Sequence, residues 1–72
     1  MSWSRGVFSD MVAELGYDDE NQELLVTWAK GRNRQGAYIG VPEDVADACS
    51  RSASVGGYIN SNIKGAYPYE SR

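Results

Sequence analysis

Alternating apolar and polar positions predict three strands in the first part of the chain. The clearest strand places Leu24, Val26 and Trp28 on one face and the residues between them on the other. A second segment is expected to end at Gly16 and Tyr17, before a polar turn cluster. Strands joined by such short turns favour an antiparallel meander. The predicted strands span residues 11–17, 23–29 and 37–41.

The spacing of apolar residues then changes and predicts two helices. Pro42 suits the first turn of a helix, and Glu43 and Asp44 complement the positive end of its dipole. This helix should fade near Ser52. Its expected apolar face consists of Val45, Ala48 and Cys49.

Ser54 is a good N-cap for a second helix of about twelve residues. Gly56 and Gly57 lower its helix propensity, so we expect a neighbouring element or a ligand to approach the backbone closely there. The apolar stripe of this helix is expected to contain Val55, Ile59, Ile63 and Ala66.

These elements predict an α+β fold: a three-stranded antiparallel β-meander followed by two helices packed on one face. Residues 1–9 lack periodicity and are predicted to form a mobile N-terminal arm, in which Trp3 and Phe8 serve as anchors or oligomer contacts. Residues 10–72 are predicted to be a single domain. A three-stranded sheet leaves two edges and one face uncovered, so we expect a homo-oligomer.

Composition narrows the classes of function. The chain has 72 residues, no His, one Cys and a formal net charge of −3. A structural zinc site, an intrachain disulfide and a His-activated nucleophile are therefore not expected. We expect no catalytic residue, no metal and no cofactor, and hence no enzyme. No apolar run approaches the roughly 18 residues that cross a membrane, and residues 1–10 lack a signal-peptide core, so a cytoplasmic location is expected.

The second predicted helix carries a candidate ligand face. At the helical period, Gly56, Asn60, Lys64 and Tyr67 fall within a sector of about 80°, beside the apolar stripe. An amide reads polar groups, an ammonium binds phosphate or carboxylate, and a phenol ring stacks. The alternative is that Asn60 and Lys64 are simply solvated.

Two further groups suit the same chemistry. The loop 30–34 is the densest basic cluster, and Arg34 belongs to it, as a phosphate ligand or as part of a solvated hairpin tip. Tyr38, Tyr67 and Tyr69 would either stack on a base or fill the core. Cys49 is expected to be a small buried apolar residue.

Several short motifs resemble the KTSC domain family, a small module that also occurs at the C-terminus of some lysyl-tRNA synthetases and as a free-standing protein in bacteria and phages. The resemblance covers about Val12 to Glu70. Its motifs here are Leu15-Gly16-Tyr17-Asp18, Leu24-x-Val26-x-Trp28, Tyr38-Ile39-Gly40-Val41-Pro42, Ala53-Ser54-x-Gly56-x-Tyr58-x-Asn60 and Asn62-Ile63-Lys64-x-x-Tyr67-x-Tyr69-Glu70.

The resemblance makes five residues motif positions and gives no assigned function, because the family's RNA-binding role is suggested only by its fusion to tRNA synthetases. In one departure, Gly36 stands where the family usually has the first Tyr of a Tyr-x-Tyr pair, which implies a more open site there. The alternative for these motif positions is a structural clasp. They are Ser54, Gly56, Asn60, Lys64 and Tyr67.

Three functions follow as expectations. The first is a non-enzymatic binding module for a phosphate-bearing ligand, such as a phage protein that sequesters a nucleotide signal of host immunity inside the bacterial host cell. The second is an RNA-binding module for tRNA-like or single-stranded RNA. The third is a protein-interaction module that inhibits or adapts a host protein. The candidate ligand-binding residues are Arg34, Tyr38, Ser54, Gly56, Asn60, Lys64, Tyr67 and Tyr69.

Overall fold

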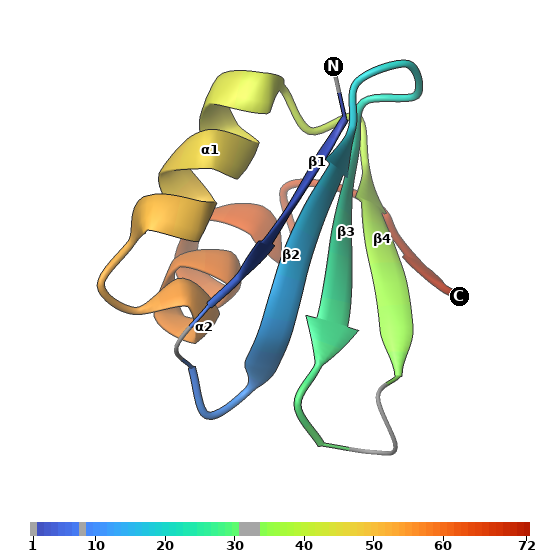
Figure 1. The fold of residues 1–72 in the computed structure, drawn as a ribbon. Coiled ribbons are helices and arrows are strands. Elements are labelled where there is room, and N and C mark those ends of the chain that lie inside the picture. Colours follow the sequence, from blue (N-terminus) through green and yellow to red (C-terminus); the bar gives the residue numbers. More distant parts are fainter. Residues whose placement is uncertain (1, 8, 31–33) are drawn as a thin grey trace.

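The computed structural model describes residues 2–7, 9–30 and 34–72. In these residues, five strands form one antiparallel sheet in the order β1-β2-β3-β4-β5, with the helices on one face (Figure 1). The strands are β1 (Trp3–Gly6), β2 (Val12–Asp18), β3 (Glu23–Trp28), β4 (Gln35–Ile39) and β5 (Tyr69–Ser71). The helical segments between β4 and β5 are α1 (Glu43–Arg51), α2 (Val55–Tyr58) and the π-helix η1 (Ile59–Ile63).

The predicted class is confirmed, and the predicted number of strands is wrong. The three expected strands correspond to β2, β3 and β4, which form the centre of the sheet. The structure adds β1 beside β2 and β5 beside β4. No helix in the described part of the chain is long and apolar enough to cross a membrane.

The core lies between the helices and one face of the sheet. Cross-strand partners share this face, so Leu15 opposite Val26 and Tyr17 opposite Leu24 all point toward the helices. All four side chains are buried, and the Tyr17 hydroxyl donates a hydrogen bond of 2.7 Å to the backbone oxygen of Val41. The fold therefore rests on strands that alternation predicted. The helices add Ala46, Cys49, Val55, Ile59 and Ile63 to this core.

The N-terminal strand is held against α1. The Arg5 guanidinium donates hydrogen bonds to Asp47 Oδ1 at 2.6 Å and to Ser50 Oγ at 2.8 Å, and it also lies 4.1 Å from the centre of the Trp3 ring. Trp3 in turn stacks on Tyr17, with ring centroids 5.9 Å apart. These contacts join β1 to both the sheet and the helix.

The expectation of a mobile arm is therefore wrong for Trp3–Gly6, because this segment pairs with β2 and packs on the core. Trp3 does act as an anchor, as predicted. Phe8 lies outside the described residues.

The first helix begins and ends close to where the sequence predicts. Pro42 is its N-cap residue, and Glu43 and Asp44 occupy the first turn. Its buried side chains are Ala46 and Cys49. The prediction for Cys49 is confirmed. The expectation for Ala48 is wrong: it is exposed, and Ala46 takes its place in the core.

The second helix changes type along its length. The Ser54 hydroxyl accepts a hydrogen bond of 3.3 Å from the Gly57 N–H, which confirms the predicted N-cap. Beyond Ile59 the hydrogen bonds widen to the π pattern, and the Lys64 N–H donates to the Ile59 oxygen at 2.7 Å. The helix ends at Ile63, so Ala66 lies outside it and is exposed, against expectation.

Candidate ligand-binding site

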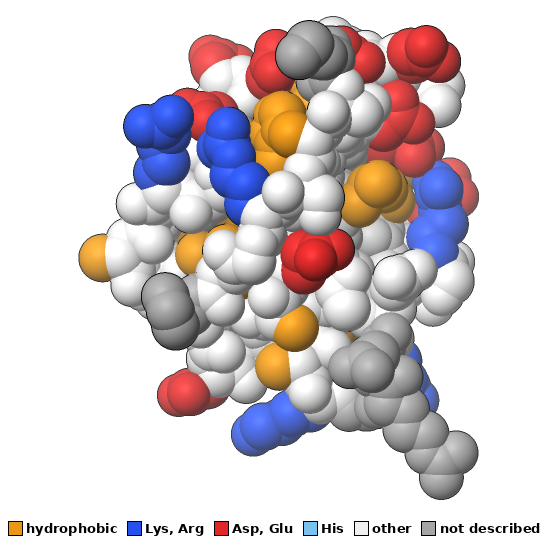
Figure 2. All heavy atoms as spheres, in the orientation of Figure 1, with side chains coloured by type: hydrophobic (Ala, Val, Ile, Leu, Met, Phe, Trp, Pro, Cys, Tyr) orange, Lys and Arg blue, Asp and Glu red, His pale blue; other side chains and the backbone are white. Residues whose placement is uncertain are grey.

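Charge is distributed unevenly between the two ends of the sheet. The β2–β3 turn and the start of α1 lie at one end, where Figure 2 shows acidic side chains gathered at the top of the molecule. Burial, followed by the negative charges of Glu43, Asp18 and Asp44, raises the pKa of the Tyr17 phenol at this end. The carboxylates of this end belong to Asp18, Asp19, Glu20, Glu23, Glu43 and Asp44.

The β3–β4 turn lies at the opposite end and carries the exposed Lys30 and Arg34 (Figure 1). Residues 31–33 of the basic loop are outside the described part of the chain. The local charge therefore favours binding of an anion at this end over the acidic end, although the whole chain has a net charge of −3.

Three aromatic rings meet near this end, on the face of the sheet that carries the helices. We call Trp28, Tyr38 and Tyr69 the aromatic patch. The Tyr69 ring lies 4.9 Å from Tyr38 and 6.5 Å from Trp28, measured between centroids, and both pairs are tilted. The Trp28 Nε1–H donates a hydrogen bond of 3.0 Å to the Tyr69 hydroxyl. Tyr69 is 45% exposed, so the patch presents an aromatic surface to solvent.

The register of the sheet brings Arg34 to this patch. The Trp28 N–H donates to the Arg34 backbone oxygen at 2.8 Å, which extends the β3–β4 pairing by one residue beyond Thr27 and Gln35. Arg34 therefore lies across from Trp28, and directly opposite residues share a face. The backbone of the exposed Arg34 thus lies next to Trp28, one of the three rings of the patch.

The structure contradicts the expectation of an opening at Gly36. This residue is buried, and the Tyr69 ring occupies the position that a side chain on Gly36 would take. A ring from β5 therefore fills the place where the family pattern has a tyrosine from β4.

Tyr38 is 5% exposed and belongs to the core. Burial is the largest cause that raises the pKa of its phenol. Burial also raises the pKa of the Cys49 thiol to about 11, so this thiol stays protonated and unreactive near neutral pH. The buried Tyr38 ring packs against Tyr69, and Tyr69 is the member of the patch that a ligand can reach.

The predicted helical ligand face is not formed as a single face. Gly56 is buried, with the place of its missing side chain next to the Met11 sulfur. Asn60 lies in the π-helix and is exposed, Lys64 follows it in extended conformation and is exposed, and Tyr67 packs against the core. The sector was predicted with α-helical spacing, and the π turn and the helix end at Ile63 remove that spacing.

Ser54 and Gly56 lie in a different place from the aromatic patch. They line an open hollow of about 670 Å³ between the β1–β2 turn and the start of α2. The hydroxyl of Ser54 already caps the helix, which supports the alternative of a structural clasp for these two motif positions. The other residues that line this hollow are Ser9, Asp10, Met11, Ala53, Val55 and Gly57.

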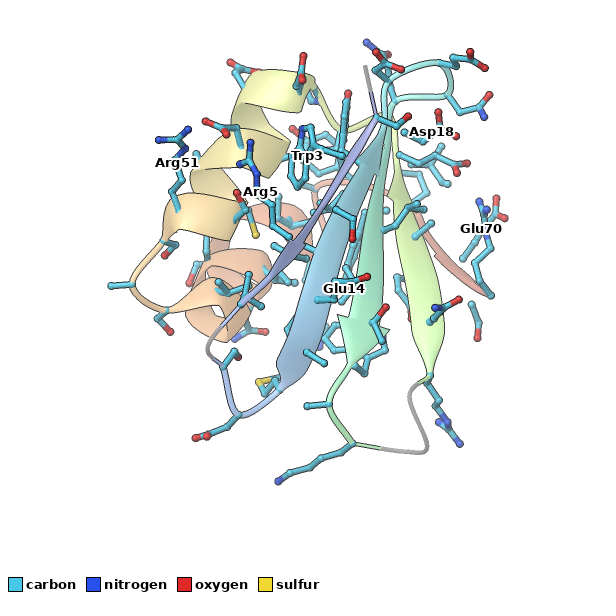
Figure 3. The ribbon with its side chains drawn as sticks, viewed as in Figure 1. Trp3, Arg5, Glu14, Asp18, Arg51 and Glu70 are labelled. Carbon is cyan, nitrogen blue, oxygen red and sulfur yellow. The ribbon has the colours of Figure 1, made fainter. Side chains whose placement is uncertain are left out.

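A second hollow, of about 680 Å³, lies on the sheet face that the helices leave open. Gly16 and Leu25 are among the residues that line it, and Glu14 and Asp18 lie on this side of the sheet in Figure 3. The Arg72 guanidinium at its rim is bound to Glu23 Oε2 at 2.8 Å. Its charges are mostly negative, so it is a poorer place for a phosphate than the aromatic patch.

Sequence reasoning missed one residue of the patch and the glycine that its Tyr69 ring packs against. Trp28 was predicted only as an apolar residue of a strand, and Gly36 only as a departure from a family pattern. Their pairing with Tyr69 joins positions 33 or more residues apart, and no local signal in the sequence reports it.

The comparisons with known proteins agree with this fold. The model of the KTSC domain matches residues 8–67. The chain belongs to the KTSC domain family. A solved KTSC domain protein from Yersinia pestis is similar to it, with 24% sequence identity and a TM-score of 0.87, over 100% of this chain and 99% of the other. This similarity extends the KTSC fold to both ends of the chain. The comparison with curated proteins gave no match.

Proposed function

We propose that this KTSC protein is a non-enzymatic binding module for a phosphate-bearing ligand, and that a nucleotide binds at the aromatic patch. The observation that carries the proposal is the exposed aromatic patch at Tyr69, whose hydrogen-bond partner Trp28 lies across from Arg34 in the sheet. Nucleobases stack on aromatic rings, and a guanidinium binds phosphate through two donors at once. The patch offers both groups within one short stretch of sheet.

The uneven charge supports a small anion over a long one. Acidic side chains gather at the far end of the sheet, so a nucleotide at the β3–β4 end avoids them. A long polyanion that extends across the molecule would meet these carboxylates. Holding a nucleotide without converting it lowers its free concentration, so sequestration of a nucleotide signal is the role that we propose for the module.

Thermal unfolding tests this proposal. The purified protein is heated with mononucleotides, cyclic dinucleotides and short RNAs in turn. A ligand at about 100 times its Kd stabilises the folded state by about 2.7 kcal/mol, which raises the Tm of a small domain by several degrees. We expect such a rise with at least one small nucleotide, and we expect Arg34→Gln to remove most of it.

Arg51→Gln is the matched control. Arg51 is also an exposed arginine, with 72% of its side chain accessible, and it lies on α1 beside Asp47. The control variant should keep the nucleotide-dependent rise in Tm. An equal loss in both variants would mean a general charge effect, and no rise with any nucleotide or RNA would contradict the proposed function.

RNA binding remains a second proposal, because aromatic rings beside basic side chains also bind single strands. Several phosphates would then be bound at once, and affinity would fall steeply as salt is raised. Titration of a short RNA at low and at physiological salt separates the two proposals. A flat salt response favours the small nucleotide.

A further inference from the structure

The Tyr69 ring occupies a notch in the sheet that exists only because residue 36 is glycine. The hydroxyl and two ring carbons of Tyr69 lie where a Cβ on Gly36 would stand. Any larger residue at this position would exclude the ring. The notch is therefore a slot for a flat ring, with the backbone of β4 as its floor.

The notch also contains a directed hydrogen-bond donor. Trp28 Nε1–H points at the Tyr69 hydroxyl at 3.0 Å and is satisfied by it. An indole N–H donates and never accepts, so a group that replaces Tyr69 must offer an acceptor atom at its edge. A purely hydrocarbon ring would leave the donor without a protein partner.

Tyr69 is held in this slot by a side-chain hydrogen bond, two ring contacts and its pairing with Tyr38. It is the first residue of β5, a strand of three residues that are all exposed, at the edge of the sheet. The residue is 45% exposed although its ring contacts Trp28 and Tyr38. Edge segments with few buried contacts are the parts of a fold that open at low cost.

We propose that Tyr69 is an internal stand-in for the ligand, and that a nucleobase displaces its ring from the Gly36 notch and accepts the hydrogen bond of Trp28. This inference rests on the proposed function and specifies how that same site holds the base. The carbonyl oxygens and ring nitrogens of nucleobases are suitable acceptors. Arg34, which lies across from Trp28, would then bind the phosphate.

Displacement and simple stacking predict opposite effects of one substitution. If a base replaces the Tyr69 ring, Tyr69→Ala removes a competitor and tightens nucleotide binding. The free energy needed to move the ring out of the Gly36 notch no longer has to come from the ligand. We expect a gain of about tenfold, which corresponds to about 1.4 kcal/mol. If a base stacks on the outer surface of the Tyr69 ring, the same substitution weakens binding.

Three further variants complete the experiment, which measures nucleotide affinity by calorimetry. Tyr69→Phe keeps the ring and loses the acceptor for Trp28, so a smaller gain in affinity is expected. Gly36→Ala places a methyl group in the notch and should weaken binding by about tenfold or more. Gly16→Ala is the glycine control, since its Cβ would meet only ordinary neighbours, the nearest being the Trp3 backbone oxygen at 3.4 Å.

Trp28 fluorescence in a Trp3→Phe background gives a second readout, and we expect nucleotide to change its emission. Weaker binding by Tyr69→Ala, with Arg34 still required, would overturn this inference and leave the proposed function standing. Unchanged affinity in Gly36→Ala would also overturn it. Absence of nucleotide binding by both the wild type and Tyr69→Ala would contradict the proposed function as well.

Discussion

The two edge strands of the sheet are attached in different ways. β1 is bound to the first helix as well as to the sheet. Arg5 donates hydrogen bonds to Asp47 and Ser50 on α1, and Trp3 stacks on the buried Tyr17. β5 has no helix over it in Figure 1 and consists of exposed residues. Its side chains are attached by the hydrogen bond and ring contacts of Tyr69 with Trp28 and Tyr38, and by the ion pairs of Arg72.

Because of this difference, β1 is needed to keep the core covered, whereas β5 is the edge strand that can move when a ligand binds. The attachments of β1 join three elements, so its release would expose part of the core. β5 is paired with β4 at the edge of the sheet and is also held by the Tyr69 ring and the ion pairs of Arg72, so its release would expose the Gly36 notch and the neighbouring Tyr38 ring. Deleting residues 1–9 would test the role of a mobile arm. In this fold the same deletion removes the strand β1.

The largest expected effect is on β1. Trp3→Ala removes a half-buried indole and its stack on Tyr17, and we expect the free energy of unfolding to fall by about 2 kcal/mol. Tyr69→Ala at the opposite edge should cost about 1 kcal/mol, since it loses one hydrogen bond and part of an aromatic contact. Urea unfolding of both variants measures the difference. Equal losses would mean that the two edges are attached alike.

The second effect is a pH dependence of the β1 attachment. Hydrogen bonds from Arg5 and then Arg51 lower the pKa of Asp47 below its ordinary value of 3.8. The stability that Asp47 contributes is therefore fully present above that value and is lost as the pH falls through the lowered pKa. Wild type should exceed Asp47→Asn in Tm at pH 6, and the gap should close under strongly acidic conditions.

Asp18→Asn is the control for this titration. The pKa of Asp18 is also lowered, mainly by the side-chain hydrogen bond from Asn21, but this pair lies in the β2–β3 turn. In the Asp18 variant, the fluorescence of Trp3 should show β1 released at the same pH as in the wild type. A gap in Tm between wild type and Asp47→Asn that persists at low pH would show that the carboxylate charge is not what holds β1.

The smallest effect is expected at Arg72. Its ion pairs with Glu23 and Glu70 are partly exposed and subject to screening by salt. Arg72→Ala should change the Tm little at low salt and not measurably at high salt. A large change would mean that β5 is held by charge and would weaken the argument that Tyr69 is its main attachment.

The central strands were predictable because their alternation is strong. Leu24 and Val26 carry the period of two, and their burial follows from it. The edge strands gave no such signal. Arg5 occupies an inward position of β1, where its charge is partnered by Asp47, 42 residues away in the sequence. β5 has three residues and no alternation.

The candidate site was predictable only by residue type. Arg34 and Tyr69 were identified as groups suited to phosphate and base. The structure places Arg34 across from Trp28 and Tyr69 opposite Tyr38, and the Tyr69 hydroxyl then meets the Trp28 side chain. The helical face failed because a π turn follows from hydrogen bonds that sequence spacing does not report. Lys64 and Asn60 remain predicted ligand residues, away from the helical sector that was expected to join them.

The path of the chain between β4 and β5 also has a kinetic consequence. Each pair among β1 to β4 is joined by a short turn, whereas β5 reaches β4 only after both helices, from Ile39 to Tyr69. Closing a longer loop costs more entropy, and contacts between distant residues form slowly. We expect the hairpins to assemble first and Tyr69 to dock last, so the quenching or shift of Trp28 emission should be the slowest phase of refolding.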